Sequence, residues 1–140
     1  MRKTHSTSFY VLDTESSGFP EHGGSNEPIQ IVAVLYKDGK EAKRKPYSRY
    51  FLPNTPITDS AYKTHRLDVK KLKELGAQRI TRADIDILVN FLNEEPDYPI
   101  VAHWAKYDRE DVLKPVFEYF DKEDKFPSIS RWACTIELAK

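Results

Sequence analysis

The segment that decides the fold is Phe9-Tyr10-Val11-Leu12-Asp13-Thr14-Glu15, an apolar run that ends in two carboxylates one residue apart. A run of aromatic and β-branched residues of this length predicts a buried strand. Successive side chains on a strand point to opposite faces, so Asp13 and Glu15 are expected to share one face. Carboxylates this close either raise one pKa or bind a cation, and such hard oxygen ligands suit Mg²⁺ or Mn²⁺. The simpler alternative is a strand end that turns into a polar loop.

Length and composition indicate one folded domain over residues 1–140. The chain is 39% hydrophobic and 31% charged, which is enough apolar material for a single core. Basic and acidic residues number 22 each, which argues against a broad polybasic surface but leaves room for a local basic rim. The sequence contains neither a membrane-spanning apolar stretch nor the apolar core of a signal peptide, so we expect no membrane contact and a cytoplasmic location. Cys134 is the single cysteine and is expected to be a buried thiol.

The order of the predicted elements indicates an α/β fold with a mixed sheet. Periodicity and turn residues predict strands at 9–15, 28–36, 45–52, 99–102 and 131–134. They predict short helical pieces within 57–75, a helix over 81–94, and a second long helix from residue 105.

Several local residues set the expected element boundaries. The Asp38-Gly39 pair predicts a hairpin turn between the second and third strands, because both residues accept positive φ. Thr58 or Asp59 is expected to cap the first helical piece, and Thr81 with Asp84 forms a capping-box variant for the next helix. Pro115 should kink or split the second long helix. Thr135 is expected to begin a further helix.

A second cluster of chemically useful residues lies between His103 and Asp108. A buried strand ends here and a helix begins, so Asp108 falls near the first turn, where the helix dipole favours an anion. As an alternative, Asp108 serves only as a capping or dipole partner of that helix. His103 is expected to be a hydrogen-bonded histidine at a strand end rather than a base.

Taken in order, these blocks resemble the DEDD exonuclease family, and within it the DEDDh branch, which includes the proofreading subunit of bacterial DNA polymerase III and ribonuclease T. The resemblance covers nearly the whole chain, in the blocks 13–19, 27–34, 51–65, 101–108 and 134–140. It implies a ribonuclease H-like mixed sheet flanked by helices. It also implies hydrolysis of DNA or RNA from the 3′ end by two Mg²⁺ or Mn²⁺ ions.

The resemblance also implies roles for particular residues. Asp13, Glu15 and Asp108 would be the metal ligands and catalytic residues. Contacts to the terminal nucleotide would come from Ser16, Ser17, Gly18, Phe19 and His65. Phe19 would stack on or wedge beside the last base, although packing within its own loop is an alternative. The implied partner is a single-stranded DNA or RNA 3′ end, with a second copy of the chain, a polymerase or another protein as candidate protein partners.

The sequence departs from the family pattern at several positions. Arg66 stands where the family usually has glycine, Trp104 where it has asparagine, and Gln30 where it has glutamate. Family members continue beyond the last block into helices with a histidine base and a fourth carboxylate, whereas this sequence stops at Lys140. We therefore expect a C-terminally incomplete exonuclease-like domain with little activity by itself.

Other interpretations stay open at this stage. The chain could be a natural short form, a partner could supply the missing groups, or the same pocket could bind a 3′ end without cutting it. A phosphatase with an aspartate nucleophile is disfavoured, because Asp13-Thr14-Glu15 lacks the second aspartate that such enzymes place at this spacing.

Overall fold

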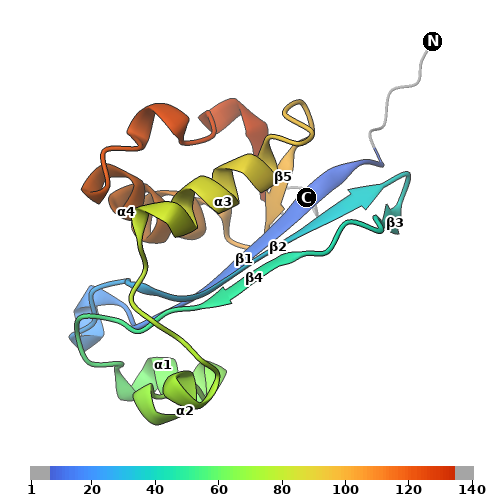
Figure 1. The fold of residues 1–140 in the computed structure, drawn as a ribbon. Coiled ribbons are helices and arrows are strands. Elements are labelled where there is room, and N and C mark those ends of the chain that lie inside the picture. Colours follow the sequence, from blue (N-terminus) through green and yellow to red (C-terminus); the bar gives the residue numbers. More distant parts are fainter. Residues whose placement is uncertain (1–6, 135–140) are drawn as a thin grey trace.

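The two longest strands form the centre of a mixed sheet (Figure 1). The computed structural model describes residues 7–134. Strand β1 (Phe9–Ser16) runs antiparallel to β2 (Pro28–Lys37), with Glu15 opposite Gln30. Tyr10, Leu12 and Thr14 of β1 are buried, so Asp13 and Glu15 lie on the opposite face, as the period of a strand predicts.

The remaining strands complete a ribonuclease H-like sheet in the order β3-β2-β1-β5-β6. Strands β3 (Lys40–Glu41) and β4 (Tyr47–Tyr50) both pair with β2, while β5 (Ile100–Ala102) and β6 (Trp132–Cys134) run parallel to β1 and to each other. The predicted mixed α/β sheet is confirmed. The carboxyl ends of β1 and β5 meet at one edge of this sheet, and both chemically useful clusters of the sequence lie there.

Turn and cap residues behave largely as predicted. Asp38 and Gly39 have φ values of 54° and 79°, which confirms the two-residue hairpin turn. Helices α1 (Asp59–His65) and α2 (Val69–Glu74) are the two short helical pieces. Thr58, not Asp59, caps α1, because its side chain accepts a hydrogen bond from the Ala61 N–H.

The two longer helical segments differ in regularity. Helix α3 (Arg82–Leu92) begins with the expected capping box of Thr81 and Asp84. The second is divided into a π-helical segment η2 (Tyr107–Leu113) and α4 (Lys114–Tyr119), with Pro115 in the first turn of α4. Pro115 does not split this helix, because the backbone stays in the right-handed helical region at Leu113 and Lys114 and η2 runs directly into α4. The hydrogen-bonding pattern changes from π to α at this point. Short 3₁₀ segments complete the described elements: η1 (Pro20–His22), η3 (Glu123–Lys125) and η4 (Ile129–Arg131). The helix expected from Thr135 lies outside the described residues.

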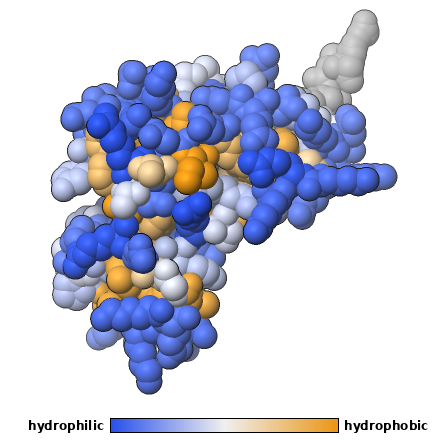
Figure 2. Space-filling view, in the orientation of Figure 1, coloured by the Kyte–Doolittle hydropathy of each residue, from blue (hydrophilic) through white to orange (hydrophobic). Residues whose placement is uncertain are grey.

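The main core lies between the sheet and the helical layer of α3, η2 and α4 (Figure 1). It is built from fully buried side chains that include Tyr10, Leu12, Leu88, Leu113 and Phe117. A smaller cluster of Ile29, Leu72 and Ala77 holds α2 against β2. Hydrophilic residues dominate the face drawn in Figure 2, and hydrophobic residues gather in patches between them. Cys134 is a buried free thiol, as predicted, and no helix within residues 7–134 has the length and apolar character needed to cross a bilayer.

Candidate active site

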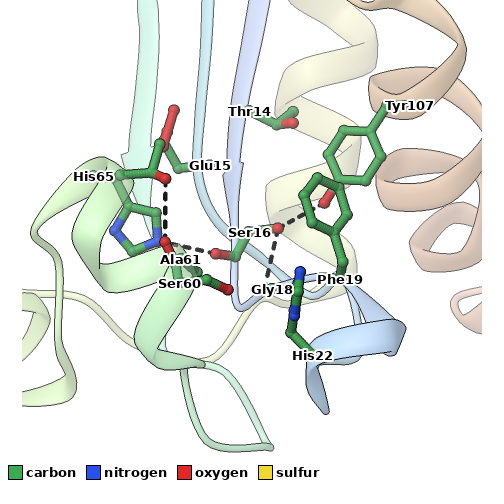
Figure 3. Close-up of a pocket in the computed structure, with 11 residues that line it drawn as sticks. Thr14, Glu15, Ser16, Gly18, Phe19, His22, Ser60, Ala61, His65 and Tyr107 are labelled. Atoms are coloured by element: carbon green, nitrogen blue, oxygen red, sulfur yellow. Dashed lines mark hydrogen bonds between the residues drawn. The ribbon is translucent and has the colours of Figure 1, made fainter.

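A cavity of about 240 Å³ opens beside the end of β1 (Figure 3). The end of β1, the following loop and helix α1 surround it, and Tyr107 of η2 closes another side. Its lining includes Glu15, Ser16, Gly18, Phe19 and His65. Four of the five residues that the resemblance implies as substrate contacts therefore line the same space as one of the implied catalytic carboxylates.

Three carboxylates influence one another at this edge of the sheet. Burial is the main cause that raises the pKa of Asp13, and the charge of His103 opposes this effect. Burial also raises the pKa of Glu15, and the negative charge of Asp13 raises it further. Burial raises the pKa of Asp108 to about 6, with additional increases from Asp13 and Glu15. β1 and η2 thus bring the three predicted residues within electrostatic reach of one another.

Asp108 is held in place by β1 rather than by its own helix. It is 5% exposed, and one of its carboxylate oxygens accepts a hydrogen bond of 2.5 Å from Thr14 Oγ1. This hydrogen bond partly offsets the rise in the pKa of Asp108. The side chain of Asp108 therefore reaches across to the sheet. A residue that only capped its own helix would not make this contact.

The chemistry of the three carboxylates suits a hard divalent cation. Their side chains, however, are not arranged as a set of metal ligands. A cation would favour the charged carboxylates against the burial that raises their pKa values, and oxygen donors are those that Mg²⁺ and Mn²⁺ prefer. As the side chains stand, however, no group of three or more His, Cys, Asp or Glu residues within 7–134 is arranged to hold a metal ion. The metal role of Asp13, Glu15 and Asp108 stays a prediction.

Gly18 allows the loop after β1 to pass close to α1. Its φ is 130°, a region that L side chains rarely adopt, and a Cβ atom here would lie 2.3 Å from Thr58 Oγ1. The neighbouring Thr58 N–H donates to the Ser17 carbonyl at 2.9 Å. This close approach holds the loop against the start of α1, beside the cavity that Gly18 lines.

Ser16 and Tyr107 connect the loop to the second cluster of the sequence. The two hydroxyl oxygens lie 2.7 Å apart, and the Tyr107 hydroxyl donates to Asn26 Oδ1 at 3.0 Å. The Gly18 N–H donates to Ser16 Oγ at 3.3 Å. The Tyr107 ring is thereby fixed as a wall of the cavity. The sequence prediction missed Tyr107. Its position directly before Asp108 could have indicated an aromatic residue at the site.

Ser17 has a structural position instead of a place in the cavity. It is fully buried, its Oγ accepts from the Glu27 N–H, and its own N–H donates to the Glu27 carbonyl. Its carbonyl accepts from Thr58. Because these groups are engaged within the protein, the geometry gives no support to the predicted substrate contact of Ser17.

His65 orients the end of β1 and lines the cavity. Its Nδ1 accepts from the Leu67 N–H, and its Nε2 lies 3.0 Å from the Ser16 carbonyl oxygen. A nitrogen facing a carbonyl must carry the proton, so the ring is the Nε2–H tautomer. Burial lowers its pKa, which favours the neutral ring. His65 therefore positions Ser16 and is not arranged to accept a proton from water.

Phe19 packs against a neighbouring ring and also remains accessible to a ligand. Its ring packs edge-on against Tyr107 with centroids 5.0 Å apart, and it remains 37% exposed at the mouth of the cavity. Figure 3 shows the two rings beside each other. The ring is thus held by the loop and still offers surface to a ligand.

Several solved structures with a similar fold are exonucleases. Exonuclease X in complex with 5′ overhanging duplex DNA superposes with a TM-score of 0.54 at 23% identity over 94% of this chain. A 3′-exonuclease described in 3′-end specific recognition of a histone mRNA stem-loop gives 0.60 at 13% identity over 84%. Exonuclease I in complex with an inhibitor gives 0.70 at 13% identity over 96%.

These similarities establish the fold, at sequence identities too low to define more. The chain spans 61%, 54% and 30% of the length of those three proteins. No protein-family model and no curated protein sequence matches the chain.

Proposed function

We propose that this chain is a DEDDh-type 3′-to-5′ exonuclease domain that hydrolyses single-stranded DNA or RNA with two Mg²⁺ or Mn²⁺ ions. The single observation that carries the proposal is that Asp13 and Glu15 act electrostatically on the buried Asp108, beside a cavity of about 240 Å³ that Glu15 lines. The fold shared with three exonucleases supports it.

In this proposal the three carboxylates hold the metals. When bound, such ions activate water and stabilise the leaving 3′ oxygen of a phosphodiester. Asp13 and Glu15 present their oxygens from one face of β1, and Thr14, on the opposite face, orients Asp108. His65 keeps the end of β1 in place through Ser16.

The cavity residues would hold the last nucleotide of the strand. Phe19 offers an exposed aromatic surface on which the terminal base stacks. Gly18 contributes only its backbone to the cavity, since the place of a Cβ atom is occupied by Thr58. The hydroxyl of Ser16 faces the same space and can bond to the sugar or phosphate.

A catalytically impaired 3′-end binding module is the second candidate. One observation favours it: within residues 7–134 the carboxylates are not grouped as a metal site.

A 3′-end degradation assay distinguishes the two candidates. A 5′-labelled single strand is incubated with the protein and Mg²⁺ or Mn²⁺, beside a strand whose 3′ end is blocked. The exonuclease proposal predicts a ladder that shortens from the free 3′ end and disappears with EDTA or in Asp13→Ala. Asp124→Asn, at an exposed position far along the chain, is the matched control.

The outcomes separate cleanly when binding is measured on the same strand. Binding of the free 3′ end without shortening supports the binding module. Shortening that persists in EDTA or in Asp13→Ala contradicts the metal mechanism, and the absence of both binding and shortening rejects both candidates.

A further inference from the structure

Helix α1 lines two adjoining cavities. The first cavity is the one described above, and its lining includes Ser60, Thr64 and His65 of this helix. The adjoining cavity has a volume of about 520 Å³, and Lys63 of the same helix lines it. The two cavities share His22 and Ser60. A positive charge therefore stands directly beside the space proposed for the 3′ end.

Basic side chains continue from this point along α1 and α2. The α1–α2 basic surface consists of the exposed cations of the two helices and the link between them: Lys63, Arg66, Lys70, Lys71 and Lys73. Leu72 is fully buried against β2, and successive residues of a helix are turned by about 100°, so the lysines on either side of it project away from the core. Hydrophilic residues cover the lower end of the molecule in Figure 2, where α1 and α2 lie in Figure 1.

The cations of this surface have no carboxylate partner within the part of the chain that the structure describes. The ion pairs among residues 7–134 all lie outside α1, α2 and their link. Basic residues at the other end of the sheet are paired instead, Lys37 with Glu95 and Arg44 with Glu94. The charge of the α1–α2 basic surface is therefore available to an external anion.

Acidic residues of the same stretch do not cancel this charge. Residues 59–74 contain three carboxylates, Asp59, Asp68 and Glu74, against the five cations. Asp68 caps α2 by accepting a hydrogen bond from the Lys71 N–H, and the other two stand at the outer ends of the stretch. The whole chain has 22 basic and 22 acidic residues, so this positive excess is local.

Arg66 occupies a backbone conformation that favours glycine. Its φ is 60°, in the left-handed region, at the carboxyl end of α1. Its guanidinium lies 5.6 Å from the centre of the Tyr62 ring, which holds the charge against the outside of α1. A long basic side chain at a position where glycine would be less strained indicates a use for that side chain.

We propose that the α1–α2 basic surface binds the phosphates of a single strand whose 3′ end lies in the first cavity. The inference rests on the proposed function for that position of the 3′ end. Each cation that neutralises a phosphate releases counterions and so adds affinity. Strands long enough to reach α2 therefore bind more tightly than dinucleotides, which fill only the first cavity, and the substrate class is long single strands.

Three thymidine ligands test the strand's path. They are a dinucleotide, a linear strand of about 16 nucleotides, within the size range of single-strand sites, and a circular strand of the same length, which has no 3′ end. Binding is measured by calorimetry in EDTA, which prevents metal-dependent cleavage, at several salt concentrations. We expect the linear strand to bind more tightly than either of the other ligands.

Two sets of substitutions measure the contribution of the lysines. The α2 variant combines Lys70→Gln, Lys71→Gln and Lys73→Gln. The matched control removes the same charge from exposed lysines at the other end of the sheet, around β3: Lys40→Gln, Lys43→Gln and Lys45→Gln.

The salt dependence of binding gives the expected size of the effect. For the linear strand, the slope of log affinity against log salt should fall by about 2 in the α2 variant, since each phosphate contact of a single strand contributes about 0.7. Relative to about 1 M salt, where the two proteins bind alike, this slope means about 100-fold weaker binding at about 0.1 M. The control should bind like the unaltered chain, and the dinucleotide should bind all three proteins equally.

These outcomes are separate from the test of the proposed function, because no cleavage is measured. Equal losses in the α2 variant and the control, a dinucleotide that binds as tightly as the linear strand, or equal binding of linear and circular strands would overturn the inference even if the chain degrades 3′ ends. A loss confined to the α2 variant would support it even if no degradation is found. The comparison of the three ligands uses the unaltered chain, so it decides the question if the α2 variant fails to fold.

Discussion

At the scale of single residues, the site depends on small groups that hold larger ones in place. Gly18 lets the loop approach Thr58, Thr14 orients Asp108, and His65 fixes the carbonyl of Ser16. Each of these groups lies beside a residue of the candidate site. Their substitution should therefore affect stability and ligand binding together.

Replacing Gly18 should destabilise the protein. In Gly18→Ala the new methyl group meets Thr58 and the backbone is held at a φ of 130°. We expect a loss of about 1–3 kcal/mol in the free energy of unfolding, the cost of a strained backbone position. Urea unfolding measures it. Gly23→Ala is the matched control in the same loop, because its φ is also positive, at 86°, but a methyl group there would meet no atom within 4 Å beyond its chain neighbours. Equal losses in the two variants would show that the contact with Thr58 is unimportant.

Asp108 should make the metal-free protein more stable as the pH falls. Its pKa is about 6 in the folded chain against an ordinary value of 3.8, so the folded state takes up its proton first. The free energy of unfolding should therefore rise as the pH decreases from about 6 towards 3.8 and should be lower again at neutral pH. A shift of about two units corresponds to roughly 3 kcal/mol.

The comparison with Asp108→Asn isolates this effect from the other carboxylates. Unfolding is followed in EDTA at several pH values, and the difference between the two proteins is plotted. We expect Asp108→Asn to be the more stable protein at neutral pH and the difference to vanish in acid. A difference that is independent of pH would show that Asp108 titrates normally.

At the scale of elements, the prediction from sequence succeeded where local chemistry decides. The Asp38-Gly39 turn and the Thr81 capping box both follow from the backbone preferences of the residues themselves. The prediction of the third strand was less accurate. The range 45–52 contains only β4 (Tyr47–Tyr50), and the short β3 lies before it.

The candidate site was predictable in part for the same reason. The common face of Asp13 and Glu15 follows from the period of a strand, whereas the link from Thr14 to Asp108 joins residues 94 positions apart. The sequence also did not indicate the buried position of Ser17 or the place of Tyr107 in the cavity wall. The hydroxyls of both residues are directed by tertiary hydrogen bonds that no local pattern reports.

Arg131 connects two secondary-structure elements through contacts that the sequence did not predict. Its guanidinium donates to the carbonyls of Leu92, Glu95 and Tyr98 and lies 5.5 Å from the centre of the Tyr10 ring. It joins the end of α3 to the start of β6. A positive charge at a helix carboxyl end is also favourable.

Substitution of Arg131 should loosen this junction. We expect Arg131→Leu to lower the free energy of unfolding by about 2–4 kcal/mol, because several partly buried carbonyls lose their donor. Arg131→Lys should recover little, since one ammonium cannot reproduce the forked guanidinium geometry. Chemical denaturation tests both variants, with Arg79→Leu as the surface control. A loss below about 0.5 kcal/mol, the usual size of a surface substitution, would contradict the assignment.

At the scale of the whole molecule, the sheet brings distant parts of the chain to one edge. β1 supplies two carboxylates and the loop that forms the first cavity, while the turn after β5 leads to Asp108. The ribonuclease H-like topology thus places the proposed metal ligands and the base-stacking surface of Phe19 next to each other. The proposed function depends on this arrangement.

The most direct test of the account is a calorimetric titration of the metal-free chain with Mn²⁺, beside Asp13→Asn and the control Asp124→Asn. If Asp13, Glu15 and Asp108 form one metal site, the chain and the control bind Mn²⁺ with the same affinity, and Asp13→Asn binds at least about tenfold more weakly, the loss of one charge-assisted ligand. Equal binding by all three proteins, or no binding by the unaltered chain, would contradict the central claim.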